Sequence, residues 1–206
     1  MTTRLDLRTA VRQRVQDESV TPLWSDSTLN EFLSAALGRY GVLFPREANA
    51  TTLVAAGVTS FAVSAVSEPG RIVRVLDDQA VVVPAQQGFD TNGQSGPVAQ
   101  TWRWWTGSVV LATPAPRTGN WTVEHRTRRT LPADDVTAAD IIAGDEEIVV
   151  LLAAAAALRR QLVAEGKQGL GRGRDPLALA AETARLEADR LIAGRRRRAH
   201  GGWLGN

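Results

Sequence analysis

Side chains able to do chemistry are sparse in this 206-residue chain. It contains no Cys, which excludes disulfides, thiolate nucleophiles and Cys-ligated zinc. The two histidines, His125 and His200, are too few for a His-rich metal centre. His125 lies between Glu124 and Arg126 in a strand-like run, and a catalytic His needs a nucleophile and an orienting acid within reach, a geometry that the sequence does not establish. We therefore expect no catalytic residue, no metal ligand and no cofactor.

Two further clusters invite a chemical interpretation. Asp134, Asp135 and Asp140 could bind a metal or transfer protons, but they lack a matched His or Glu and lie in a Pro-containing loop. Roles in turns and helix caps are therefore favoured for them. The glycines of residues 166–173 suggest a phosphate loop, but no strand precedes them and neither GK[ST] nor GxGxxG is present. We interpret that segment as a flexible hinge.

Three tryptophans gather at Trp102, Trp104 and Trp105. On a strand the first two side chains would point to one face and the third to the other, so that indoles would fill both faces of a small module. Core packing is the favoured interpretation. A protein interface, in which Trp is over-represented, stays open. A stacking platform for single-stranded nucleic acid ranks last, because Arg103 is the only cation inside the cluster.

A run of four arginines precedes a Trp-Leu pair near the end of the sequence. These residues are Arg195, Arg196, Arg197, Arg198, Trp203 and Leu204. Such a run can be a solvated tail, a phosphate-binding cluster that releases counterions from nucleic acid, or a handle that docks on an acidic protein groove. A Trp-Leu pair is costly to leave in water and suits an arm that becomes ordered on a partner. We favour docking on a protein.

The formal charge of +2 hides an uneven distribution. From Arg159 onward the sequence holds eleven Lys and Arg against five Asp and Glu, whereas the residues before it hold thirteen against seventeen. The body is therefore mildly acidic and the C-terminal segment is basic. No apolar run approaches the roughly 18 residues of a membrane span, and the N-terminus lacks a signal-peptide core. These features predict a soluble, intracellular, non-redox protein.

Two helices are expected near the N-terminus, over residues 4–16 and 26–44. The first has apolar residues at helical spacing on one face, namely Leu7, Ala10, Val11 and Val15. Ser25 or Asp26 caps the second helix, because both residue types can accept hydrogen bonds from unpaired backbone N–H groups.

Short β-branched runs between turn signals follow, over residues 53–128. Candidate strands cover residues 59–66, 71–76, 80–83, 101–105, 109–113 and 121–126. Asp77-Asp78 joins the second strand to the third, and Thr106-Gly107 joins the fourth to the fifth, both at hairpin spacing. Residues 85–99, rich in Gly, Gln, Asn and Ser, are expected to form a long exposed loop. We predict a small antiparallel β module inserted between helices.

Helix is expected again over residues 145–165, where acidic residues precede an Ala-rich apolar run and arginines end it, an order that complements the helix dipole. After the hinge, Asp175-Pro176 starts a helix over residues 176–193, which Gly194 ends. The predicted fold class is α+β: a helical bundle around the central Ala-rich helix, an inserted small antiparallel β module, and a protruding C-terminal helix and tail. Residues 1–165 would form the body and residues 166–206 a C-terminal docking arm.

Short motifs follow one another in a distinctive order over residues 4–165. They are Leu7-Arg8-x-x-Val11-Arg12, Trp24-Ser25-Asp26-x-x-Leu29, Phe32-Leu33-x-x-Ala36-Leu37, Trp104-Trp105-x-Gly107, Pro114-x-Pro116, Trp121 to His125, Arg129-Thr-Leu-Pro132 and the Ala-rich run of residues 147–160. In this order and combination, the chain resembles the head-to-tail adaptor (connector) proteins of tailed bacteriophages.

The resemblance implies a structural virion protein without catalytic activity. Such adaptors form a twelve-copy ring beneath the portal, extend the DNA channel without binding DNA specifically, and present a surface to the next neck or tail protein. We expect Ala-faced helices to pack side by side in the ring, residues 195–198 with Trp203 and Leu204 to dock on the portal, and Trp102, Trp104 and Trp105 to serve a ring or neck interface. The protein would lie in the virion neck and, during assembly, in the host cytoplasm. The alternative is a nucleic-acid-binding module that uses the Arg-rich tail.

Overall fold

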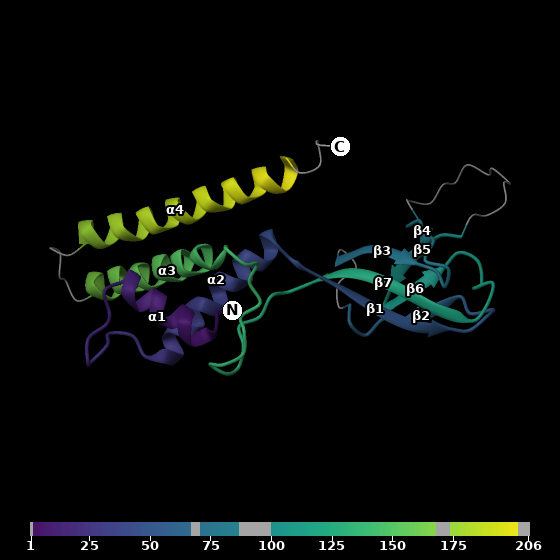
Figure 1. Ribbon diagram of the computed structural model, residues 1–206, viewed down its shortest axis with the longest axis horizontal. Coiled ribbons are helices and arrows are strands. Elements are labelled where there is room, and N and C mark those ends of the chain that lie inside the picture. Colours follow the sequence, from purple (N-terminus) through teal and green to yellow (C-terminus); the bar gives the residue numbers. More distant parts are fainter. Residues whose placement is uncertain (1, 67–70, 87–99, 168–173, 202–206) are drawn as a thin grey trace. The chain divides into compact units, whose positions relative to one another are not determined.

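A computed structural model describes residues 2–66, 71–86, 100–167 and 174–201, without the side chains of residues 174, 175 and 197–201. The chain forms two compact units (Figure 1). The helical unit comprises Met1–Phe44 and Arg128–Asn206, and the β unit comprises Pro45–Thr127. The described residues form four helices and two antiparallel sheets, which confirms the predicted α+β class.

The first two helices are close to those predicted. Helix α1 spans Arg4–Arg14 and begins with a capping box, in which the Thr3 side chain accepts from the Asp6 backbone N–H and the Asp6 side chain accepts from the Thr3 backbone N–H. Helix α2 spans Asp26–Leu43, and Ser25 caps it by accepting from the Thr28 N–H. Each helix ends one or two residues before its predicted end, where the last turn frays easily.

Helices α3 and α4 lie along one another (Figure 1). Helix α3 spans Glu146–Lys167 and contacts all three other helices, and α4 spans Arg174–Gly201. The predicted end of the last helix at Gly194 is wrong, because α4 continues through the arginines. A Gly inside a helix costs only about 1 kcal/mol relative to Ala, and the Arg residues that follow favour helix.

The last helix is not a separate arm over most of its length. It buries Ala181, Ala184, Ala188 and Ile192, three of which belong to the same core as residues of α1, α2 and α3. The small Ala side chains allow α4 to approach α3 closely. The predicted boundary between residues 165 and 166 therefore differs from the division of the structure, which places α4 in the helical unit.

The core of the helical unit draws on all four helices. Its fully buried members include Leu7 and Val11 of α1, Leu29, Leu33, Leu37 and Tyr40 of α2, and Val149, Leu151, Ala153 and Ala157 of α3. Burial of aliphatic side chains contributes about 25 cal/mol per Å² of apolar surface, so this cluster is the main stabilising feature of the unit.

The β unit consists of two antiparallel sheets. One has the order β1-β7-β3-β4 and the other the order β2-β6-β5. The strands are β1 Arg46–Val54, β2 Ser60–Ala62, β3 Ile72–Leu76, β4 Val82–Val83, β5 Trp102–Trp105, β6 Ser108–Leu111 and β7 Gly119–Thr127. Their inward side chains form a second core around Trp121, Val75, Val109 and Val123.

The sequence interpretation missed β1, which pairs with β7 from Arg46↔Thr127 to Val54↔Gly119. Its Ala, Asn and Thr residues are weakly apolar, so that the strand has no strong period-two signal. Both predicted hairpins are confirmed. In the β5–β6 turn, Thr106 and Gly107 both have positive φ (43° and 84°), as a type I′ hairpin requires. Most of the expected loop at 85–99 lies outside the described residues.

Candidate functional site

His125 is the candidate catalytic residue whose side chain is described, and it lines a pocket of about 590 Å³ together with Glu47 and Glu124. His125 is buried in β7, in register with Ala48 of β1, and its Nδ1 lies 3.2 Å from the Val123 carbonyl oxygen. The side chain of His200 lies outside the described part of the chain. Within the described ranges, no group of three or more His, Asp or Glu side chains could hold a metal ion.

The aspartates of the loop before α3 serve turns and ion pairs. Asp134 accepts hydrogen bonds from the backbone N–H groups of Val136 (2.9 Å) and Thr137 (2.6 Å). These bonds, that of Thr137 first, lower the pKa of the Asp134 carboxyl below its ordinary value. Asp140 accepts from the Arg129 guanidinium at 2.7 Å. The favoured turn interpretation is thus correct for Asp134, whereas Asp140 and Asp135 pair with arginines.

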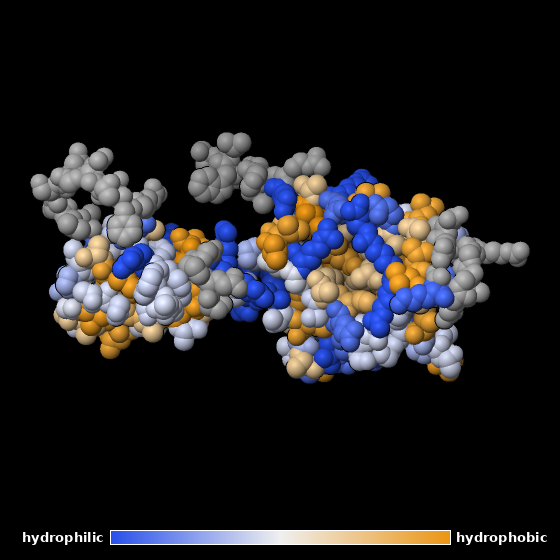
Figure 2. Space-filling view, turned by 180° about the vertical axis from the view of Figure 1, so that it is seen from behind, coloured by the Kyte–Doolittle hydropathy of each residue, from blue (hydrophilic) through white to orange (hydrophobic). Residues whose placement is uncertain are grey.

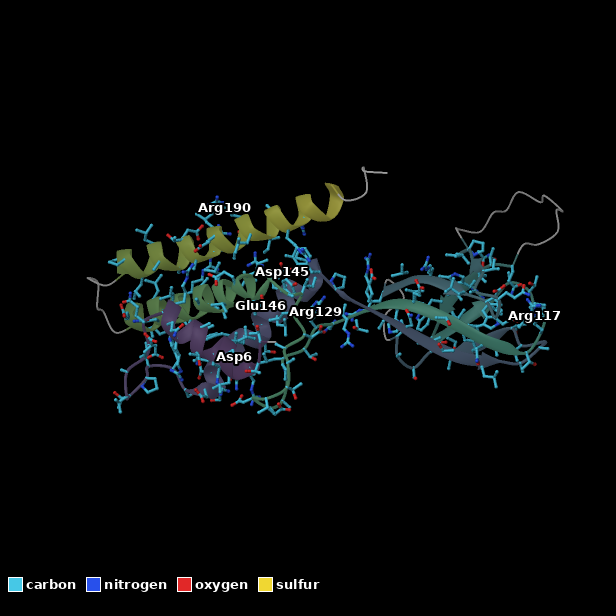
Figure 3. All side chains as sticks on the ribbon, viewed as in Figure 1. Asp6, Arg117, Arg129, Asp145, Glu146 and Arg190 are labelled. Carbon is cyan, nitrogen blue, oxygen red and sulfur yellow. The ribbon has the colours of Figure 1, made fainter. Side chains whose placement is uncertain are left out.

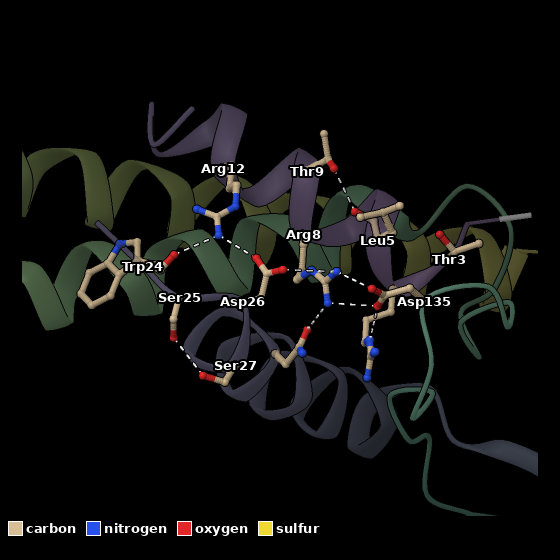
Figure 4. A network of polar contacts seen from close by, with 12 residues as sticks. Thr3, Leu5, Arg8, Thr9, Arg12, Trp24, Ser25, Asp26, Ser27 and Asp135 are labelled. Atoms are coloured by element: carbon tan, nitrogen blue, oxygen red, sulfur yellow. Dashed lines mark hydrogen bonds and ion pairs between the residues drawn. The ribbon is translucent and has the colours of Figure 1, made fainter. Parts of the chain in front are cut away.

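Asp135 belongs to a network along one face of α1 (Figure 4). Arg8, which is only 6% exposed, donates to both of its carboxylate oxygens, at 3.0 and 2.6 Å. Arg4 donates through Nε to Oδ1 at 2.6 Å. These two bonds, that of Arg8 first, hold the pKa of the Asp135 carboxyl below its ordinary value. The part of the loop around Asp135 is thereby tied to α1.

Arg12 extends the same network toward the loop between α1 and α2. It donates to Asp17 at 2.9 Å, to Asp26 at 2.8 Å and to the Trp24 carbonyl oxygen at 2.9 Å. Asp26 also lies 3.6 Å from Arg8. The Arg8, Arg12 and Asp26 positions of the opening motifs therefore meet in space. The sequence analysis did not anticipate this network, although the spacing of Arg4, Arg8 and Arg12 by four residues places them on one helix face.

A buried carboxylate, that of Asp145, holds the C-terminal part of α4 at Arg195. Asp145, which is 4% exposed and directly precedes α3, accepts from the Tyr40 hydroxyl at 2.8 Å and lies 3.3 Å from the Arg195 Nε. Burial raises the pKa of the Tyr40 hydroxyl above its ordinary value, and the bond to Asp145 acts in the same direction. Arg129, labelled with Asp145 in Figure 3, lies over the Tyr40 ring at 5.6 Å.

The expected docking residues are only partly described. Arg195 is tied to Asp145, whereas Arg196 is exposed. The backbone at Arg197 and Arg198 is helical, and Trp203 and Leu204 lie outside the described residues. Since Arg195 pairs with the residue before α3, the six residues 196–201 continue α4 by about 9 Å past that level, at 1.5 Å per residue.

A groove opens beside this end of the helical unit. It lies between the C-terminal halves of α2 and α4 and has a volume of about 720 Å³. Its lining residues are Arg39, Val42, Leu43, Asp189, Ile192, Ala193 and Arg196. Arg39 and Asp189 pair across it at 3.3 Å. The surface of the helical unit elsewhere also shows apolar patches among charged side chains (Figure 2).

The tryptophans of β5 divide between core and surface. Trp102 is buried and donates through Nε1 to the Val83 carbonyl oxygen at 3.0 Å, and Trp104 packs against the same core. Trp105 is 61% exposed, and the Arg103 guanidinium lies 5.7 Å from its ring centroid. The expectation that indoles fill both faces is therefore wrong for Trp105, because the outer face of this short hairpin has no covering layer among the described residues.

No family model matches the chain, and no curated protein is significantly similar to it. None of the helices, over the residues that the structure describes, has an apolar stretch long enough to cross a bilayer.

Proposed function

We propose that this chain is a structural adaptor of the head-to-tail connector type. It would form a ring, of twelve copies as in the family that it resembles, beneath the portal of a tailed bacteriophage. In this position it would extend the DNA channel and join the capsid to the tail, as a protein of the virion neck.

The observation that carries the proposal is the basic end of α4. The helix is held along α3 by its Ala face and by the Arg195–Asp145 pair, and it then continues past the start of α3 with Arg196, Arg197 and Arg198. A supported helix end that carries consecutive cations suits insertion into an acidic groove of another protein. We assign Arg197 and Arg198 of this end, with Trp203 and Leu204 after them, to docking on the portal.

The contacts between copies must use surfaces other than those first expected. Ala181, Ala184 and Ala188 of α4 are buried within the chain, so that this face is not open to a neighbouring copy. Leu179 and Leu186 of the same helix remain exposed, at 70% and 56%. We therefore propose that neighbouring copies contact one another through exposed aliphatic side chains and not through their Ala faces.

The β unit offers a different surface, suited to the next neck or tail protein. Trp105 stands exposed on a rigid hairpin, with the Arg103 guanidinium beside its ring. Exposed Trp with neighbouring Arg is typical of residues that dominate the binding energy of protein interfaces. Trp102 and Trp104 would support Trp105 from the core rather than take part directly.

The docking role is tested with charge reversal at the end of α4. The double variant R197E/R198E retains Arg195 with its pair to Asp145 and also retains Arg196, so the fold of the helical unit should persist. We expect it to lose association with portal-containing capsids in a co-sedimentation assay. Arg190→Glu is a control for charge reversal elsewhere on the helix, since Arg190 extends from the side of α4 away from α3 (Figure 3). Unchanged association of the double variant would contradict the proposal.

The same arginines also suit a second candidate function, that of a nucleic-acid-binding module. That function predicts DNA affinity with a steep dependence on salt, because each neutralised phosphate releases counterions. The double variant R197E/R198E would then flatten the slope of log affinity against log salt. The adaptor function predicts only weak, non-specific DNA binding, and it predicts that the two substitutions change this slope little.

A further inference from the structure

The loop between α1 and α2 presents exposed aliphatic side chains on a backbone held by hydrogen bonds. In residues 17–24, here the Val20 loop, Val20 is fully exposed (102%) and Leu23 is 59% exposed. The buried Asp17 carboxylate accepts from the backbone N–H groups of Leu23 (2.6 Å) and Trp24 (3.1 Å). The Ser19 hydroxyl donates to the Thr21 carbonyl oxygen at 2.7 Å.

This loop is therefore ordered before it meets a partner. Gln16, directly before the loop, has φ of 56°, and this left-handed turn ends α1 with a hydrogen bond from the Asp17 N–H to the Arg12 carbonyl oxygen at 2.9 Å. Arg12 completes the anchoring by donating to Asp17 at 2.9 Å. A preordered loop loses little conformational entropy on binding, so its exposed aliphatic side chains can contribute most of their burial energy to a contact.

The groove between α2 and α4, described above, has matching chemistry. Its apolar wall includes Val42, which is 81% exposed, and Ile192. Arg39 at its edge is neutralised by Asp189, whereas Arg196 makes no ion pair with the residues that the structure describes. The groove thus combines an apolar wall with one unneutralised cation.

The Val20 loop carries the complementary charge. Glu18 is exposed, two residues before Val20, and has no ion pair within the described part of the chain. An acid beside two exposed aliphatic residues fits a groove with an aliphatic wall and a cation at its edge. Each chain carries both the loop and the groove, so copies of the same chain can satisfy both surfaces.

A chain cannot fill its own groove with this loop. The loop precedes Asp26, the first residue of α2, and the groove lies at Val42, sixteen residues further along a straight helix. At 1.5 Å per residue this separates them by about 24 Å. The occupant must therefore come from a second copy.

We infer that the Val20 loop of one copy seats in the groove between α2 and α4 of the next, with Glu18 beside Arg196. The contact is head-to-tail, because the two surfaces differ, and such contacts propagate from copy to copy until a ring closes. This inference rests on the proposed function and names the surfaces through which the ring would form.

Two complementary variants test the inference. Val20→Asp removes the apolar side chain at the tip of the loop and does not change the groove. Val42→Asp places a charge in the apolar wall of the groove and does not change the loop. We expect the wild-type chain to form oligomers whose mass rises with concentration in analytical ultracentrifugation, and each variant alone to remain monomeric. An equimolar mixture of the two variants should form dimers and nothing larger, because only one intact loop can meet one intact groove. Val136→Asp, at an 85% exposed position of the same unit, is the matched control and should behave as wild type.

Charge exchange provides a second test with no apolar substitution. Glu18→Arg or Arg196→Glu alone should weaken the self-association about tenfold, and the double variant should restore it. Circular dichroism of each variant checks that helix content is retained.

Several results would overturn the inference. These are a wild-type chain that stays monomeric up to about 1 mM, Asp variants that oligomerise as wild type does, or a mixture that forms no dimer. If the wild-type chain stays monomeric yet sediments with portal-containing capsids, the inference fails while the proposed function stands. If it oligomerises through these surfaces but ignores capsids, the proposed function fails instead.

Discussion

Arg195 of α4 lies 3.3 Å from Asp145, measured between Nε and Oδ2, although fifty residues separate them in the sequence. The same carboxylate oxygen accepts the Tyr40 hydroxyl of α2 at 2.8 Å. One buried carboxylate therefore joins three helices at the level where α3 begins. This contact determines where the supported part of α4 ends and where its projecting basic end starts.

Removal of this carboxylate should destabilise the helical unit. Asp145→Ala leaves the Tyr40 hydroxyl and the Arg195 guanidinium without their partner, and breaking a buried pair in this way costs about 3 kcal/mol. The free energy of unfolding in urea measures the loss. Asp189→Ala, which breaks exposed pairs with Arg39 and Arg185, is the control and should cost less than about 1 kcal/mol. Equal losses in the two variants would show that Asp145 has no special role.

Tyr40 permits a direct spectroscopic check of its surroundings, because it is the only tyrosine of the chain. Since burial raises the pKa of its hydroxyl in the folded state, tyrosinate absorbance should stay low above pH 10.0, the ordinary value. The unfolded chain loses this proton at lower pH than the folded chain, so the free energy of unfolding should fall as pH rises above about 10. A folded chain that titrates at the ordinary value would contradict the buried contact.

The α1 network should make stability sensitive to acid. Its arginines lower the pKa of the Asp135 carboxyl below 3.8, so near and below that pH the unfolded state binds the proton more readily. The stabilisation is therefore complete above about pH 4 and is lost as pH falls through the folded-state value. In Asp135→Asn, the free energy of unfolding should depend less steeply on pH in this range. An unchanged pH slope would refute this role of Asp135.

Two glycines should respond to Ala in opposite directions. Gly194 lies inside α4, and a Cβ added there would meet no neighbouring element within 4 Å, so Gly194→Ala should stabilise the helical unit by about 1 kcal/mol. Gly107 has φ of 84° in the β5–β6 turn, and Gly107→Ala should destabilise the β unit by about 1 kcal/mol. Thermal unfolding of each variant measures both effects. Changes of the same sign would contradict one of the two backbone assignments.

The sequence predicted well those elements whose signals are local. The apolar period and the Ser25 cap located α2 to within one residue, and Thr106-Gly107 identified its hairpin. Contacts between residues far apart in the chain could not be predicted from local sequence patterns. The hydrogen bonds between Arg8 and Asp135 join residues 127 positions apart, and no local pattern specifies such a partner.

Other differences arise where tertiary structure overrides a local preference. Strand β1 forms because β7 supplies a partner along its whole length, although its own residues favour strand only weakly. Helix α4 passes through Gly194 because packing on α3 supports the turns before it. In the candidate site, the sequence identified the arginines correctly as a basic cluster. It did not reveal that Arg195 is held by Asp145.

The pairing of Arg46 with Thr127 has a consequence for replacement of the β unit. The two ends of the β unit leave the helical unit after Phe44 and rejoin it at Arg128, and they enter as neighbouring partners in one sheet. A short turn could join Phe44 directly to Arg128. The whole β unit can therefore be replaced by another segment while the four helices keep their core. The helical unit is therefore closed on itself apart from this one paired exit and entry, and shortening or replacing the β unit changes its surface without breaking the helical core.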